Sequence, residues 1–166
     1  YQETPRHEPY NINATLTKTN TGLLLNGHKQ LVINGSSSDY LIVVCRSAGN
    51  AAERDGLSLV LVNSSDAGIT IANNLLLDST PSSNITFKNV EISPENILGE
   101  LGNSADLIDK IYSRAAIALS ADMLGGIQSA FEMTLDYLKV REQFGAKIGG
   151  AERQKYPLKV VRGGLL

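Results

Sequence analysis

Residues 103–145 read NSADLIDKIYSRAAIALSADMLGGIQSAFEMTLDYLKVREQFG, and this stretch decides the fold. Its apolar and small side chains recur at steps of three and four residues, which marks one face of an α-helix. The stripe comprises Ile108, Ile111, Ala115, Leu119, Met123, Ile127, Ala130, Phe131, Thr134 and Leu138. At 1.5 Å per residue the helix would be roughly 60 Å long. Such a helix needs other long helices beside it, and the chain supplies few.

Both ends of this helix carry recognisable signals. Asn103 or Ser104 is expected to cap the start by accepting a backbone N–H. Lys139 and Arg141 suit the negative end of the helix dipole. Gly145 is expected to close the helix in the left-handed conformation. After it, residues 151–156 are compatible with one further short helix.

The pair Gly125-Gly126 interrupts the middle of the predicted helix, where each glycine costs about 1 kcal/mol relative to alanine. Two explanations remain open. Another backbone approaches closely at this point, or the pair is a tolerated kink.

Short strand signals, separated by turn residues, fill the region before the helix. The expected strands cover residues 14–19, 22–25, 29–34, 41–46, 57–62, 68–72 and 85–90. Asn26-Gly27 stands between two apolar runs and predicts a hairpin turn, and residues 41–46 are expected to be buried on both faces. Strands about ten residues apart are typical of an antiparallel sandwich or barrel. The predicted fold class is therefore α+β, with an antiparallel β-barrel or sandwich domain followed by a long helix of an incomplete helical bundle.

Composition and charge argue against several classes of protein. The 166 residues carry a net charge of -2, which offers no basic surface for nucleic acid. The longest apolar run, Leu41–Cys45, is too short to cross a bilayer. The single Cys45 lies in an apolar strand, so we expect a packed, inert thiol in a cytoplasmic protein. The chain opens on Tyr1 without a targeting signal, and we expect it to belong to something longer or processed.

Three stretches together resemble the acyl-CoA dehydrogenase family of flavoproteins. Residues 23–47 (LLLNGHKQLVINGSSSDYLIVVCRS) are similar to a strand pair of the family's middle domain, one strand of which lies against the flavin. Residues 135–149 (LDYLKVREQFGAKIG) are similar to the motif Y-x-x-x-R-x-Q-F-G-x-x-I-G, which ends the first long helix of the family's C-terminal domain. Residues 90–100 (VEISPENILGE) are similar to the family's exit from the sheet. The resemblance implies a middle β-domain over residues 1–100 and the start of a truncated C-terminal helical domain over residues 101–166.

The resemblance also implies FAD as cofactor and acyl-CoA thioesters as substrates, which the family dehydrogenates between the α and β carbons. In the family, the Arg and Phe of R-x-Q-F-G reach the FAD of a neighbouring subunit, at the pyrophosphate and near the adenosine. Here these residues are Arg141 and Phe144. The residues alone indicate only a helix-terminal cation and a hydrophobic contact at the cap. The resemblance favours contact with the cofactor, for which a guanidinium and an aromatic ring are suitable.

The flavin-facing strand departs from the family pattern. Many members have W-I-T/S-N-G there, with the aromatic ring on the flavin and the hydroxyl bonded to flavin N5. This chain has Leu31 and Ile33 at those two places, which supply bulk but neither ring nor hydroxyl. Gln2, in a segment that resembles the family's loop over the flavin, is expected at the ring edge.

No catalytic base and no metal site are predicted. The family reaction needs a carboxylate buried enough to act near neutral pH. Where some members carry that base in this helix, just before an arginine, this chain has Ser113 before Arg114. Asp122, Glu132 and Asp136 suit a solvated helix face.

Three interpretations follow. The chain is part of an acyl-CoA dehydrogenase-like enzyme and inactive alone, or it is a non-catalytic partner that completes another subunit's FAD site through Arg141. A weaker third interpretation is a carbohydrate- or protein-binding β-sandwich with a helical arm. In each case the apolar stripe predicts a homo- or hetero-oligomer through the long helix.

Overall fold

The structure of the chain, a computed structural model, describes residues 1–20 and 22–150. It divides into two compact units, Tyr1–Ile111 and Tyr112–Leu166. The short helix compatible with residues 151–156 lies outside the described residues.

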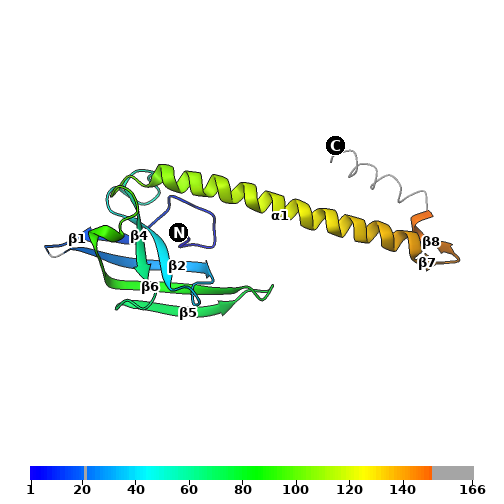
Figure 1. Cartoon of the computed structure of the whole chain (residues 1–166), viewed down its shortest axis with the longest axis horizontal. Coiled ribbons are helices and arrows are strands. Elements are labelled where there is room, and N and C mark those ends of the chain that lie inside the picture. The colour runs from blue at the N-terminus through cyan, green and yellow to red at the C-terminus, as the bar shows by residue number, and fades with distance from the viewer. Residues whose placement is uncertain (21, 151–166) are drawn as a thin grey trace. The chain divides into compact units, whose positions relative to one another are not determined.

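Unit 1 is built on a six-stranded sheet with the order β4-β3-β1-β2-β6-β5 (Figure 1). The strands are β1 (Thr15–Lys18), β2 (Leu23–Ile33), β3 (Tyr40–Arg46), β4 (Leu57–Asn63), β5 (Ile69–Leu75) and β6 (Pro81–Ile92). Neighbouring strands of this sheet pair antiparallel, except for a single parallel bridge between β1 and β3. The predicted α+β class, an antiparallel β domain followed by a long helix, is confirmed.

Inward-facing apolar residues of β2, β3, β4 and β6 form the core of unit 1. Leu25, Cys45, Leu57, Val60 and Ile85 are each at most 1% exposed. This burial is the main stabilising contribution to the unit, since each such side chain removes apolar surface from water. The expectation that residues 41–46 are buried on both faces is wrong at Ile42, which is 62% exposed, while the other five residues are buried.

Asn26-Gly27 does not form the predicted hairpin turn, because β2 runs through it without a break. Ala14 lies so near that a Cβ added to Gly27 would be 2.5 Å from the Cβ of Ala14. The side-chain oxygen of Asn26 accepts the backbone N–H of Asn89 (2.8 Å), where β6 carries one extra residue. Gly27 therefore allows the close approach of Ala14, and Asn26 bonds to the β-bulge in β6.

The predicted long helix is present as α1 (Ala105–Val140), after the short η1 (Pro94–Asn96) (Figure 1). The helix ends at Val140, before Gly145. Phe144 (φ 53°) and Gly145 (φ 78°) instead form the two-residue turn between β7 (Glu142–Gln143) and β8 (Ala146–Lys147), ahead of η2 (Ile148–Gly150). Two successive residues with positive φ are typical of a type I′ hairpin. Gly145 closes this hairpin, so its predicted role at the helix end is wrong.

The start of α1 is held by the sheet and by charges, and the predicted side-chain cap is wrong. The backbone N–H of Ser104 donates to the Leu57 carbonyl (2.9 Å), and its hydroxyl is buried without a hydrogen-bond partner among the described residues. Nearby, the Arg54 guanidinium contacts Asp109 in the first turns of the helix (2.7 Å). Pairing with β4 thus fixes the backbone that a cap would otherwise have to hold.

The apolar stripe of α1 is fully buried by the described residues only at its beginning. Ile108 is 2% exposed, whereas Leu119, Met123 and Ile127 are 60%, 58% and 54% exposed. Apart from neighbouring residues and backbone of the same helix, nothing in the described part of the chain lies within 4 Å of a Cβ added to Gly126. Within the described residues, no helix combines the length and the apolar character needed to cross a membrane.

Candidate functional site

A β-bulge near the end of β2 sets the direction of two predicted cofactor residues. Between Lys29 and Val32, β2 carries one residue more than the facing stretch of β6. Leu31 takes up the extra length with a φ of 53°, which is costly for a bulky side chain. As a result Leu31 and Ile33 are 39% and 52% exposed, as a surface that receives a ligand requires.

At the bulge, two backbone N–H groups of β2 donate to acceptors outside the backbone ladder with β6. Gln30 donates its N–H to the Gln2 carbonyl (2.8 Å), and Leu31 donates to the side-chain oxygen of Asn84 (3.3 Å). The first of these bonds brings Gln2 beside the bulge. The structure therefore brings Gln2 close to Leu31 along β2, as their predicted shared site requires.

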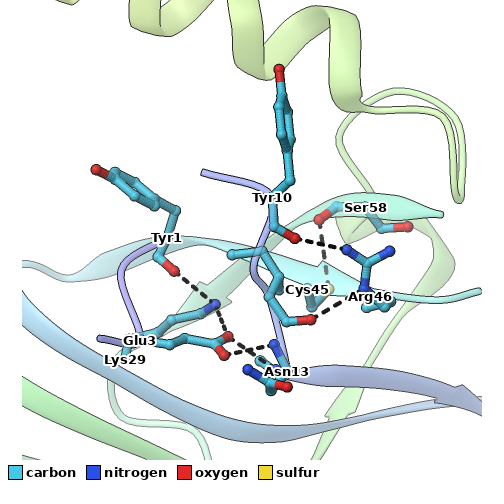
Figure 2. Close-up of polar contacts among 10 residues, drawn as sticks. Tyr1, Glu3, Tyr10, Asn13, Lys29, Cys45, Arg46 and Ser58 are labelled. Carbon is cyan, nitrogen blue, oxygen red and sulfur yellow. Dashed lines mark hydrogen bonds and ion pairs between the residues drawn. The ribbon is translucent and has the colours of Figure 1, made fainter. Parts of the chain in front are cut away.

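A buried ion pair anchors the same N-terminal segment, as Figure 2 shows. The Lys29 ammonium donates to Glu3 Oε1 (2.6 Å) and to the Tyr1 carbonyl (3.1 Å). Glu3 also accepts the backbone N–H groups of Asn13 (2.6 Å) and Ala14 (2.9 Å). The side chains of Lys29 and Glu3 are only 3% and 7% exposed, so both charges are compensated within the protein.

These contacts control the charge state of Glu3. Burial alone would raise the pKa of its carboxyl group, but the Lys29 charge and the donated hydrogen bonds outweigh it, and the pKa is lowered. Glu3 is therefore ionised at neutral pH. Nearby, burial raises the pKa of the Cys45 thiol to about 12, in agreement with the expected inert cysteine.

Arg46 secures the next part of the N-terminal segment (Figure 2). Its side chain is buried, and its guanidinium donates to backbone carbonyl groups of two loops. The acceptors are Tyr10, Ile12, Ala48, Glu53 and Asp55, at 2.8–3.4 Å. This charge is thus held by peptide dipoles.

A cavity of about 300 Å³ opens next to Ile33. Its lining is mostly apolar and includes Val32, Ile42 and Phe87, with Lys29 and Ser38 among the polar members. Apolar walls with a few polar groups are typical of small-molecule sites.

The other two predicted residues lie at the end of α1, in unit 2. Arg141 directly follows the helix, and its backbone N–H continues the helical pattern to the Tyr137 carbonyl (2.9 Å). Phe144 occupies the turn of the β7–β8 hairpin with its side chain fully exposed. A positive φ at an exposed aromatic residue is costly and contributes nothing to packing, which favours a role in contact with another molecule.

Sequence reasoning missed the Lys29–Glu3 pair, although a signal was present. Leu23, Leu25 and Lys29 are separated by even numbers of residues along β2, so their side chains lie on the same face of the strand. That face is the buried one, which places a lysine on the buried side. A buried lysine requires an anionic partner. The identity of that partner, Glu3, depends on the path of an irregular segment that periodicity does not describe.

The helix carboxylates behave as expected of a solvated face. Glu132 accepts from Gln128, and Asp136 pairs with Lys139 (2.7 Å), in exposed positions of the helix. Among the residues that the structure describes, no three His, Cys, Asp or Glu side chains gather as metal ligands would.

Comparison with known proteins gives one consistent result. The family model described as "Acyl-CoA dehydrogenase, middle domain" matches residues 4–90. An acyl-CoA dehydrogenase of Bacillus subtilis is 29% identical over 150 residues, covering 89% of this chain and 39% of the relative. A mitochondrial short/branched chain specific acyl-CoA dehydrogenase of Bos taurus is 30% identical over 128 residues, covering 75% and 29%. The chain thus spans less than two fifths of the length of these relatives.

Solved structures agree with this assignment. A glutaryl-coenzyme A dehydrogenase in complex with glutaryl-CoA superposes with a TM-score of 0.81 at 25% identity, covering 92% of this chain and 39% of the other. The FAD complex of PigA gives a TM-score of 0.85 at 26% identity, covering 99% and 44%.

Proposed function

The chain belongs to the acyl-CoA dehydrogenase family, and on that premise we propose that it forms part of an FAD-dependent oxidoreductase acting on acyl-CoA thioesters. In this proposal residues 1–100 are the middle β-domain and residues 101–166 are the start of the C-terminal helical domain. The outward-facing bulge at Leu31 and Ile33, with Gln2 fixed beside it, carries the proposal. The relatives in complex with FAD and with glutaryl-CoA support the choice of cofactor and substrate class.

The residues of the bulge fit one side of a flavin ring. When bound, FAD supplies the hydride acceptor for the α,β-dehydrogenation of the thioester. Leu31 and Ile33 offer exposed apolar surface that would exclude water from the ring, and Gln2 offers an amide at its edge. Ile33 has no hydroxyl, so this position gives flavin N5 no side-chain hydrogen bond.

Arg141 and Phe144 fit a different part of the cofactor. A guanidinium binds pyrophosphate oxygens in a bidentate manner, and the exposed ring of Phe144 suits an apolar edge near the adenosine. We assign both residues to the FAD of a neighbouring subunit.

The long helix is the proposed route of assembly into a homo- or hetero-oligomer. Its exposed apolar residues, such as Leu119, Met123 and Ile127, would be covered by helices of other subunits. Sedimentation at several concentrations tests this, because a clean monomer with a fully protected helix would contradict it.

A second candidate function is a non-catalytic partner subunit. The observation that favours it is the absence of a hydroxyl at Ile33, together with the exposed, paired state of the helix carboxylates Glu132 and Asp136. Such a chain would complete another subunit's FAD site through Arg141. In both versions we expect this chain to be inactive by itself.

Titration with FAD separates the two candidates. A near-stoichiometric flavin band from the purified chain supports the enzyme part. Binding only after mixing with a second acyl-CoA dehydrogenase subunit, and its loss in Arg141→Ala, supports the partner role. Lys139→Ala is the matched control, because Lys139 is an exposed cation of the same helix end that already pairs with Asp136. No flavin response in either setting contradicts the proposal.

A further inference from the structure

The first three residues of the chain are each fixed to β2. The Tyr1 carbonyl accepts from the Lys29 ammonium (3.1 Å), the Gln2 carbonyl accepts from the Gln30 N–H (2.8 Å), and the Glu3 carboxylate accepts from Lys29 (2.6 Å). These two strand positions directly precede Leu31. One lysine thus holds the residues on both sides of Gln2.

The anchor is a buried ion pair, and stability alone does not account for one. Apolar residues of similar volume often stabilise a fold as well as a buried ion pair does. Charged hydrogen bonds, however, fix both the separation and the direction of the groups that they join. In this unit they fix the N-terminal segment to Lys29, the last paired residue of β2 before the bulge.

We propose that Lys29 and Glu3 are a positioning pair for the cofactor surface, holding Gln2 in register with the bulge at Leu31. This inference rests on the proposed function, because the role of the pair depends on the assignment of Gln2 and Leu31 to the FAD site. Neither Lys29 nor Glu3 is assigned a contact with the ring. Their effect on the ring passes through Gln2 and the backbone of Gln30.

The test uses Lys29→Met, Glu3→Gln and the double variant of the full chain. The double variant removes both charges together, while the amide oxygen introduced by the Glu3→Gln substitution can still accept from the backbone of Asn13 or Ala14. It is therefore the variant expected to fold. Amide hydrogen exchange and FAD titration, followed by the visible spectrum, are measured on each.

A positioning role predicts a local effect. In the double variant the Gln30 amide should exchange at least about ten-fold faster, while amides of the β3–β4 ladder change less than about two-fold. The FAD dissociation constant should rise at least about ten-fold, and the spectrum of the bound flavin should shift. A merely structural role would accelerate both groups of amides alike and leave the spectrum of bound flavin unchanged.

Ser58→Ala provides the matched control. Ser58 is fully buried and bonds to Ser47 and to the backbone of Gly102, but to none of residues 1–3. Loss of the Ser58 hydroxyl should lower the stability of the chain. It should leave the spectrum of the bound flavin unchanged and the FAD dissociation constant within about two-fold of the original value.

Two different results would overturn different claims. The positioning role is wrong if the Gln30 amide stays protected in the double variant, or if the double variant binds FAD with an unchanged dissociation constant. The proposed function stands in both cases. If the unmutated chain binds no FAD, alone or with a second subunit, the proposed function fails and the role of the pair falls with it.

Discussion

Ala14 lies directly against Gly27, with 2.5 Å between the Ala14 Cβ and the place that a Cβ of residue 27 would occupy. The backbone of Ala14 is almost as near, at 2.6 Å, so a side chain could not be accommodated by a rotamer change. We predict that Gly27→Ala destabilises the chain by about 2–4 kcal/mol through overpacking and an unfavourable φ. Chemical denaturation measures this as a lower midpoint, and an unchanged midpoint would contradict the close approach.

The opposite outcome is predicted for a glycine in open space. Beyond the adjacent residues and backbone of α1 itself, nothing described lies within 4 Å of a Cβ added to Gly126, so Gly126→Ala should stabilise the helix by about 1 kcal/mol. A thermal melt of Gly126→Ala, followed by the helical signal, tests this. A lower melting temperature, or loss of self-association at unchanged helicity, would instead show that another chain approaches Gly126 closely.

Acid should lower the free energy of unfolding of the chain by protonating Glu3. Its pKa is lowered from 4.5 in the folded state, so the folded chain binds this proton more weakly than the unfolded chain does. The stabilisation is therefore fully present above about pH 4.5 and is lost as the pH falls through the lowered folded value. Denaturation midpoints of the unmutated chain and of Glu3→Gln, compared from about pH 6 to about pH 3, should converge toward low pH. Parallel curves would contradict this.

Cys45 should be unreactive while the chain is folded. It is 0% exposed, with a pKa raised to about 12, and only the thiolate attacks alkylating agents. Iodoacetamide labelling should be at least about 100-fold slower in native buffer than in denaturant. Native labelling at the rate of a free cysteine would show that the β3–β4 core opens readily.

The parts of this fold that were predictable depend on long periodic signals. The helix between residues 105 and 140 follows from apolar residues spaced three and four apart. The strand at residues 41–46 follows from an apolar run. Both signals can be seen directly in the sequence. The resemblance in residues 23–47 and 135–149 indicates the correct family from sequence alone. These features depend on many residues, so one misread position does not change them.

The errors lie at one or two residues whose role depends on partners that periodicity does not describe. Asn26-Gly27 has the composition of a turn, but Ala14 lies against Gly27 and the dipeptide is part of the continuous strand β2. Gly145 has the left-handed conformation expected of it, yet the neighbouring Phe144 shares that conformation and makes a hairpin. Likewise, nothing local to Lys29 identifies Glu3 as its partner. Tertiary contact decided the first and third cases, and a local two-residue turn decided the second.

The guanidinium of Arg46 is satisfied by carbonyl oxygens, which take up no proton in mild acid, whereas the Lys29–Glu3 anchor depends on an ionised carboxylate. Acidification should therefore detach the N-terminal segment in a fixed order. Once the pH falls below the lowered pKa of Glu3, residues 1–3 would separate from β2 while residues 10–12 stay bonded to Arg46, so acid loosens one part of the N-terminal segment and leaves the next part in place.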